Sequence, residues 1–164
     1  MRLPLLLAGL LAAAPFGQAV AQDIVRHRTP GSNFPIAMAV EVPPGATTVM
    51  VSGMVPPVAD AAAPRNSLAS FGDTRTQTAG VLSRIEASLK SIGLSLGDVV
   101  RMQVFLVGDP GRGGRMDFDG FMAAYTEHFG TPAQPNLPAR SVMQVAGLVN
   151  PGWLVEIEVT AARR

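Results

Sequence analysis

Two charged residues lie in C-terminal segments whose β-branched composition predicts β-strands. Arg140 lies in segment 136–142 and Glu156 in segment 155–159, at positions where a sheet usually takes an apolar side chain. Pro138 is compatible with the start of a strand, because its missing N–H breaks no ladder bond there. A guanidinium can bind a carboxylate through two parallel N–H donors, and a nearby glutamate can hold or deprotonate a water. The pair predicts a carboxylate-binding site with a general base.

Strand periodicity adds neighbours to each of these residues. Side chains alternate between the two faces of a strand, so Arg140, Val142 and Gln144 share one face, and Arg140 and Val142 can border one pocket. Glu158 shares the facing of Glu156, and we interpret it as a solvated or interface charge. The alternative role for Arg140 and Glu156 is a structural salt bridge at a subunit interface.

The N-terminus predicts export. Met1-Arg2 is a short positive region, residues 3–14 are an apolar run, and Ala19-Val20-Ala21 is the small-x-small pattern of a signal-peptidase site. The apolar run is shorter than the ~20 residues that a membrane-spanning helix needs. We expect cleavage after Ala21 and a periplasmic or secreted mature protein that is free of the membrane.

Charge and composition exclude several classes of function. Residues 1–21 contain Arg2 and no acid, so the 13 Lys and Arg become 12 after cleavage, against 12 Asp and Glu. A formally neutral domain is a poor nucleic-acid binder, because phosphate neutralisation supplies most of such affinity. Without cysteine there is no disulfide and no thiolate site, and the two separated histidines, His27 and His128, do not predict a metal site. About 140 mature residues fit one domain.

The remaining pattern predicts a single α+β domain of order β-β-α-β-α-β-β. We expect strands at 36–42 and 48–53, a helix at 74–92, a strand at 99–107, a helix at 118–129 and then the two C-terminal strands. Turn residues predict an irregular segment at 22–35 and a loop at 56–72. Thr74 and Gln77 fit a capping box, and Asp117 is expected to cap the second helix.

Five short segments occur in an order that resembles the reactive intermediate deaminase (RidA/YjgF) family. They are Val51–Pro56, Asp73–Thr78, Gly97–Arg101, Pro138–Ser141 and Val155–Glu158. The resemblance extends from about Phe34 to the C-terminus. It implies a chorismate-mutase-like fold, with one mixed sheet and two helices packed on one face. The expected organisation is a signal peptide at 1–21, the irregular segment 22–35 and a RidA-like domain at 36–164.

The resemblance also implies an activity. Family members hydrolyse 2-imino acids and their enamine tautomers to 2-oxo acids and ammonia, without a cofactor. On that basis Arg140 binds the carboxylate of a small-molecule substrate, aided by backbone groups at Val142, while Glu156 orients and deprotonates the attacking water. Ser52 and Gly53 line the pocket. The expected assembly is a homotrimer with its pockets between subunits.

Three positions depart from the family pattern and predict a more apolar pocket. Ile36 replaces a tyrosine, Met122 replaces an asparagine, and Val142 replaces a cysteine whose backbone, not its side chain, is used. Ile36 and Met122 as pocket walls favour a bulkier substrate. The main alternative function is a non-catalytic trimeric protein that binds small carboxylates or acts like a chaperone. A ribonuclease activity is disfavoured by neutral charge and by export.

Overall fold

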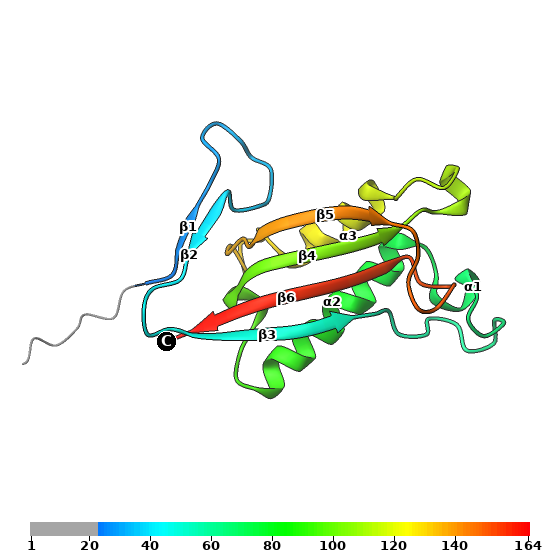
Figure 1. Ribbon diagram of the computed structural model, residues 1–164, viewed down its shortest axis with the longest axis horizontal. Helices are drawn as coiled ribbons and strands as arrows, with labels where there is room; N and C mark the ends of the chain where they lie inside the picture. The colour runs from blue at the N-terminus through cyan, green and yellow to red at the C-terminus, as the bar shows by residue number, and fades with distance from the viewer. Residues whose placement is uncertain (1–22) are drawn as a thin grey trace, which may run out of the picture.

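The computed structural model describes residues 23–164, so the expectations for the signal peptide and its cleavage after Ala21 lie outside the described residues. Figure 1 shows the arrangement of the elements. In chain order they are β1 (Val25–His27), β2 (Ala39–Glu41), β3 (Thr47–Met54), α1 (Leu68–Phe71), α2 (Thr74–Ser91), η1 (Leu96–Asp98), β4 (Val99–Val107), η2 (Pro110–Arg112), α3 (Phe118–His128), β5 (Ala139–Val145) and β6 (Val155–Arg163).

A four-stranded mixed sheet forms the centre of the domain, in the order β3-β6-β4-β5. The β4–β5 pair is parallel, and the pairs β3–β6 and β4–β6 are antiparallel. Helices α2 and α3 lie behind the sheet in Figure 1, and the face toward the viewer is open. The predicted α+β class, with a mixed sheet and both main helices on one face, is confirmed. In the part of the chain that the structure describes, no helix is long and apolar enough to cross a membrane.

The segment predicted to be irregular contains a strand. β1 pairs antiparallel with β2 in a separate two-stranded sheet, so the first strands do not join the central sheet. We call residues 23–46 the N-terminal arm (Figure 1). Arg26 attaches the arm to the domain, because its Nη2 donates to the backbone oxygens of Gly97 (2.9 Å) and Val99 (3.2 Å). These contacts span more than 70 residues, and no local pattern predicts them.

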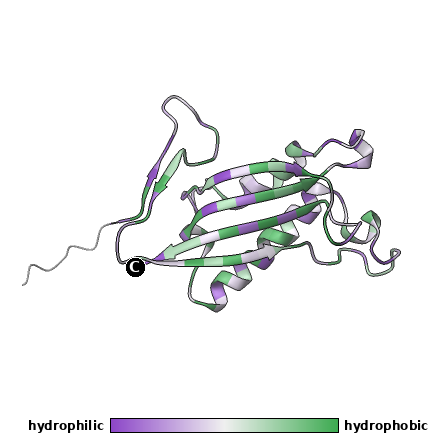
Figure 2. Cartoon of the chain, viewed as in Figure 1, coloured by the Kyte–Doolittle hydropathy of each residue, from purple (hydrophilic) through white to green (hydrophobic). Residues whose placement is uncertain are grey.

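The core lies between the helices and the sheet. In β4, Met102, Val104 and Leu106 are fully buried and alternate with side chains on the open face, as strand periodicity requires. Figure 2 shows the same alternation as hydrophobic and hydrophilic bands along the strands. On α2 the predicted apolar face is buried against the sheet. Its fully buried members are Val81, Leu82, Ile85 and Leu89.

The predicted capping box at the start of α2 is wrong. The N-cap is Asp73, whose carboxylate accepts from the backbone N–H of Thr76 at 2.8 Å. Thr74 is the first helical residue. The Gln77 side chain does not reach back to the cap, because its amide is used in contacts with distant parts of the chain.

Gln77 instead fixes the loop before β6. Its Nε2 donates to the carbonyls of Gly72 (2.9 Å) and Gly152 (3.0 Å), and its Oε1 accepts from the backbone N–H of Leu154 (2.7 Å). The side chain is 1% exposed. Because Leu154 immediately precedes β6, these bonds set where the strand that carries Glu156 begins.

We predict that Gln77→Ala lowers the free energy of unfolding by at least about 2 kcal/mol, because it leaves buried backbone groups without partners. Denaturant unfolding curves measure the loss. Ser83→Ala, on an exposed position of the same helix, is the matched control and should stay within about 0.5 kcal/mol of the parent. Equal effects of the two substitutions would contradict the role assigned to Gln77.

Candidate functional site

Arg140 lies on the edge strand β5, on the face that is turned toward the helices. In the parallel register Arg140 is paired with Met102, Val142 with Val104, and Gln144 with Leu106. These three partners in β4 are all fully buried beneath the helices. The structure therefore places Arg140, Val142 and Gln144 on one face, as the strand period predicts.

Aromatic rings surround the Arg140 guanidinium. Its Cζ lies 4.1 Å from the ring centroid of Tyr125, 5.0 Å from that of Phe121 and 5.6 Å from that of Phe34. Nη2 contacts the sulfur of Met122 at 3.2 Å. A guanidinium over a ring face is stabilised by the ring quadrupole, so these residues hold a cation in an otherwise apolar place.

No anion from the described residues balances this cation. Within residues 23–164 the ion pairs found involve other residues, and Arg140 Nη1 is buried without a hydrogen-bond partner. Burial lowers the pKa of the Arg140 guanidinium, and the neighbouring Tyr125 opposes that effect. Buried charges are normally paired, because desolvation is costly. Arg140 is therefore a buried cation that lacks the hydrogen-bonded anion such a group normally has.

Tyr125 connects the cation to the N-terminal arm. Its hydroxyl donates to the Pro35 carbonyl at 2.9 Å, and its ring stacks on Phe129. Burial raises the pKa of Tyr125 to about 12, although the nearby Arg140 acts in the opposite direction. Tyr125 therefore stays neutral at physiological pH and supplies Arg140 with a ring face and no counter-charge.

The other predicted site residues meet at the opposite edge of the sheet. Ser52 and Gly53 lie in a β-bulge of β3, between the paired residues Val51 and Met54. The Glu156 side chain crosses Gly53, and a Cβ added at Gly53 would collide with the Glu156 carboxylate. The structure thus brings Ser52, Gly53 and Glu156 together, and Gly53 is the residue that leaves room for the carboxylate.

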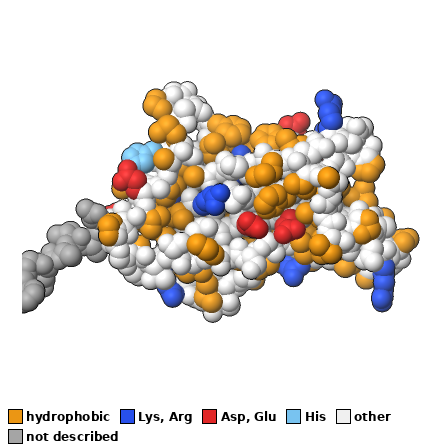
Figure 3. Space-filling view, in the orientation of Figure 1, with side chains coloured by type: hydrophobic (Ala, Val, Ile, Leu, Met, Phe, Trp, Pro, Cys, Tyr) orange, Lys and Arg blue, Asp and Glu red, His pale blue; other side chains and the backbone are white. Residues whose placement is uncertain are grey.

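These two groups of residues lie on opposite faces of the sheet. Glu156 is paired with Phe105, whereas Arg140 is paired with Met102, and these β4 positions have opposite facing. Arg140 and Glu156 are separated by two strand spacings across the sheet and by three residues along the strands. Their Cα atoms therefore lie about 14 Å apart. Within one chain the two residues cannot act on the same small molecule. Figure 3 views the open face that carries Glu156.

Sequence reasoning missed three of the residues around the guanidinium. Phe121 and Tyr125 were assigned only to the apolar face of a helix. An arginine in a strand that packs against that helix could have indicated that their rings contact its guanidinium. Phe34 lies in the loop between β1 and β2, and an aromatic residue in a loop has no periodicity to reveal its role. Ile36, predicted as a pocket wall, lies two residues beyond Phe34, and its N–H donates to the Phe34 carbonyl at 2.8 Å.

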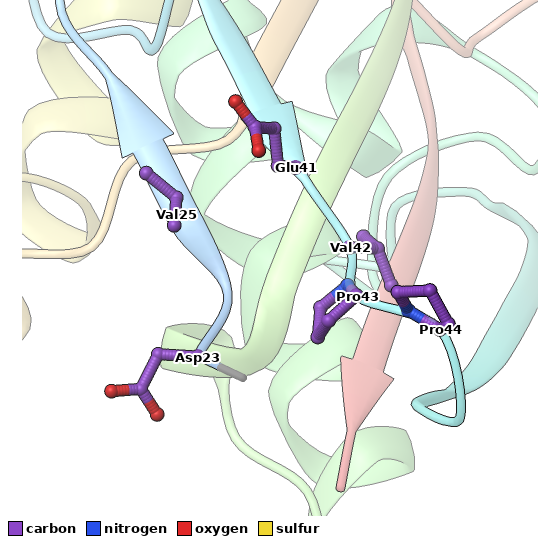
Figure 4. Close-up of a pocket in the computed structure, with 6 residues that line it drawn as sticks. All are labelled: Asp23, Val25, Glu41, Val42, Pro43 and Pro44. Carbon is purple, nitrogen blue, oxygen red and sulfur yellow. The ribbon is translucent and has the colours of Figure 1, made fainter. Parts of the chain in front are cut away.

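A cavity on the arm does not suit an anion. Figure 4 shows its lining, and its volume is about 540 Å³. The lining residues are Asp23, Val25, Glu41, Val42, Pro43 and Pro44. The lining contains no lysine or arginine, and its two carboxylates are already paired, Asp23 with Arg164 and Glu41 with His27. Among the described residues there is also no group of three or more histidine, aspartate or glutamate side chains that could hold a metal ion.

Comparison with known proteins identifies the family. A family model described as Endoribonuclease L-PSP matches residues 38–163. A RutC family protein from Sulfurisphaera tokodaii is 30% identical over 142 residues, which covers 87% of this chain and 98% of that protein. The chain belongs to the RidA/YjgF family.

Solved structures of this family share the fold. E. coli TdcF with bound serine is 29% identical, with a TM-score of 0.53, and the match covers 88% of this chain and 100% of TdcF. A Rid family protein from Yersinia pestis is 24% identical, with a TM-score of 0.63 and coverage of 86% and 98%. The second likeness concerns the fold alone. TdcF shows that a RidA/YjgF protein can hold a small molecule with a carboxylate.

The burial of Tyr125, the only tyrosine in the chain, gives a direct optical test of this site. We predict that tyrosinate absorbance develops near pH 12 in the folded protein, against about 10 in the denatured chain. Because the folded-state pKa is the higher one, the free energy of unfolding should fall as the pH rises from about 10 toward 12. The fluorescence of Trp153, the only tryptophan, reports whether the protein remains folded during the titration. Tyrosinate absorbance near pH 10 with unchanged Trp153 fluorescence would contradict the buried position of Tyr125.

Proposed function

We propose that this protein hydrolyses 2-imino acids and their enamine tautomers to 2-oxo acids and ammonia. The observation that carries the proposal is the Arg140 guanidinium, which is buried among aromatic rings and has no carboxylate partner among residues 23–164. A small carboxylate supplies the charge that such a cation requires. Family membership and the serine held by TdcF support a ligand of this size and chemistry.

Arg140 fixes the substrate by its carboxylate. The guanidinium offers parallel N–H donors, which orient a planar carboxylate as well as attract it. Strand β5 is at the edge of the sheet, so backbone groups on its outer side, near Val142, are free of ladder bonds and add further donors. The imino carbon, which is bonded directly to the carboxylate carbon, is then held at a defined distance from the cation.

Glu156 supplies the base. The imino carbon of a protonated imine is already electrophilic, so catalysis needs mainly orientation of a water and removal of its proton. The water oxygen forms a bond to that carbon while the Glu156 carboxylate takes a water proton. That proton then passes from Glu156 to the nitrogen. The C–N bond breaks with its electron pair leaving on nitrogen, while Glu156 takes the remaining hydroxyl proton and the carbonyl forms. Glu156 passes this proton to the released ammonia, so the products are the 2-oxo acid and an ammonium ion, and the Glu156 carboxylate is regenerated.

The opposite facing of Arg140 and Glu156 requires that they come from two copies of the chain. The open sheet face supports association, since it carries the partly exposed Phe105 and Met143, while Met50 is 83% exposed. Apolar side chains on an uncovered sheet face favour contact with another protein surface. We propose a homotrimer in which Glu156 of one copy faces Arg140 of the next, with Ser52 and Gly53 accompanying Glu156.

The alternative is a carboxylate-binding protein without turnover. One observation favours it, because within a single chain Arg140 has its full aromatic surround while Glu156 lies on the other face of the sheet. Binding through Arg140 alone therefore needs no assembly, whereas hydrolysis does. The two functions predict different effects of removing the Glu156 carboxylate, because hydrolysis requires it and binding through Arg140 does not.

We predict that Arg140→Ala loses both the binding of 2-oxo acids and the hydrolysis of imines, since it removes charge-assisted bonds that contribute on the order of 1.5–3 kcal/mol. Arg140→Lys should restore binding only in part, because a point charge cannot reproduce a planar pair of donors. Glu156→Gln should retain binding and lose hydrolysis. Calorimetry with pyruvate measures binding, and ammonia release from 2-imino acids made in situ by an amino-acid oxidase measures turnover.

Thermal unfolding of each variant is the control for a structural effect. Parent-like hydrolysis in both Arg140→Ala and Glu156→Gln would show that the site lies elsewhere. A parent protein that binds pyruvate through Arg140 but never accelerates imine hydrolysis would establish the binding function instead.

A further inference from the structure

Phe34 is an exposed aromatic residue placed directly beside a buried cation. Its ring centroid is 5.6 Å from Arg140 Cζ, yet the residue is 46% exposed. The other two rings around the guanidinium, those of Phe121 and Tyr125, are fully buried. Phe34 is therefore the ring that a molecule bound to Arg140 can contact.

The position of Phe34 is fixed from both sides. The Pro35 carbonyl accepts from the Tyr125 hydroxyl at 2.9 Å, so the residue after Phe34 is attached to α3 beneath Arg140. The Phe34 N–H donates to the hydroxyl of Ser32 at 3.2 Å, and the N–H of Ala37 donates to the Pro138 carbonyl, just before β5. A ring held in this way presents a defined surface.

The nearby side chains are also apolar. The Met122 sulfur lies 3.2 Å from the Arg140 guanidinium, and both Met122 and Val142 are partly buried against the core. Arg140 is thus one cation within an apolar surround. A carboxylate bound there places the rest of its molecule against hydrocarbon and an aromatic face.

Charged side chains lie near the C-terminal end of β5, around Gln144. Gln144, four residues beyond Arg140 on the same face, borders a cavity of about 560 Å³ that is also lined by Arg112, Arg115 and Asp119. Four residue rises make about 13 Å, which is farther than one amino-acid side chain extends. The Gln144 amide is already bonded to the backbone of Met116 (2.9 Å) and Gly114 (2.8 Å). Arg112 pairs with Asp117 at 3.0 Å.

We infer that Phe34 is a specificity-determining residue, and that the substrates of the Arg140 site are 2-imino acids with large apolar or aromatic side chains. This inference rests on the proposed function for its reaction, and it adds the substrate class. The side chain packs against the Phe34 ring and the Met122 thioether while the carboxylate binds Arg140. Short side chains leave this surface uncovered, and an anionic side chain meets no second cation beside Phe34, because Arg140 already binds the carboxylate.

The test compares three imines on the parent protein. The 2-imino acids derived from phenylalanine, alanine and aspartate are made in situ by oxidases of matched specificity, and kcat/KM is measured for each from ammonia release. The phenylalanine-derived imine should exceed the alanine-derived imine by roughly tenfold or more, the range that apolar pockets achieve. In Phe34→Ala that ratio should fall to within about threefold, and Phe34→Leu should lie between the two. Val149→Ala, at a 95% exposed position, is the control and should keep the parent ratio.

Calorimetric binding of phenylpyruvate and pyruvate to the same four proteins separates the two proposals. If turnover is absent but phenylpyruvate binds more tightly than pyruvate in a Phe34-dependent way, the hydrolase proposal fails and the specificity assignment stands. Equal parent ratios for phenylalanine- and alanine-derived imines, or a ratio unchanged in Phe34→Ala, would overturn the assignment. A preference for the aspartate-derived imine would also overturn it and would direct attention to Arg115.

Discussion

The Arg140 guanidinium, held among three aromatic rings without a carboxylate, is the constraint on which this account depends. Several elements of the fold contribute residues around that cation. Strand β5 carries it, α3 supplies Phe121 and Tyr125, and the N-terminal arm brings Phe34 across from the other end of the chain. Stacking on ring faces keeps the guanidinium in place, and its Nη1 group keeps no hydrogen-bond partner among the described residues. A structural ion pair would use this donor, so the aromatic surround without a carboxylate is the basis of the binding role that we propose for Arg140.

The alternation of side chains along β4, β5 and β6 then decides how the site is completed. Arg140 faces the helices and Glu156 faces the open side. A change of rotamer cannot bring side chains on opposite faces of a sheet together. At the bulge of β3, Gly53 has no side chain and therefore leaves the space that the Glu156 carboxylate occupies. In the function that we propose, one chain therefore contributes two separate parts of the site. The homotrimer that we propose places the open face of one copy beside the β5 edge of another, and so brings the two parts together. The exposed apolar residues of the open face would then lie in the contact between copies.

Local sequence patterns predicted the elements whose apolar residues recur at a regular spacing. They failed where contacts between distant parts of the chain determine the structure. Strand β4 was predicted with its observed ends, 99–107, because its alternation is regular, and Asp117 was correctly predicted to cap α3. Strand β1 was missed because its three residues depend on β2 and on the Arg26 contacts with Gly97 and Val99. The role of Arg140 as an available cation could be proposed from the sequence, but the separation of Arg140 from Glu156 could not, because it depends on the register between β4, β5 and β6.

Subunit mixing tests the central claim, a site shared between two copies, most directly. Arg140→Ala and Glu156→Gln are each expected to be inactive alone, and after they are mixed at equal amounts, dissociated and reassembled, a shared site is intact wherever an unmodified Arg140 meets an unmodified Glu156. For random trimers with a head-to-tail contact this holds at about a quarter of the sites, so imine hydrolysis should return to about a quarter of the parent rate. Light scattering of the mixture confirms that trimers have formed. Trimers of the mixed variants that remain inactive, or a parent protein that hydrolyses imines as a monomer, would contradict the shared site.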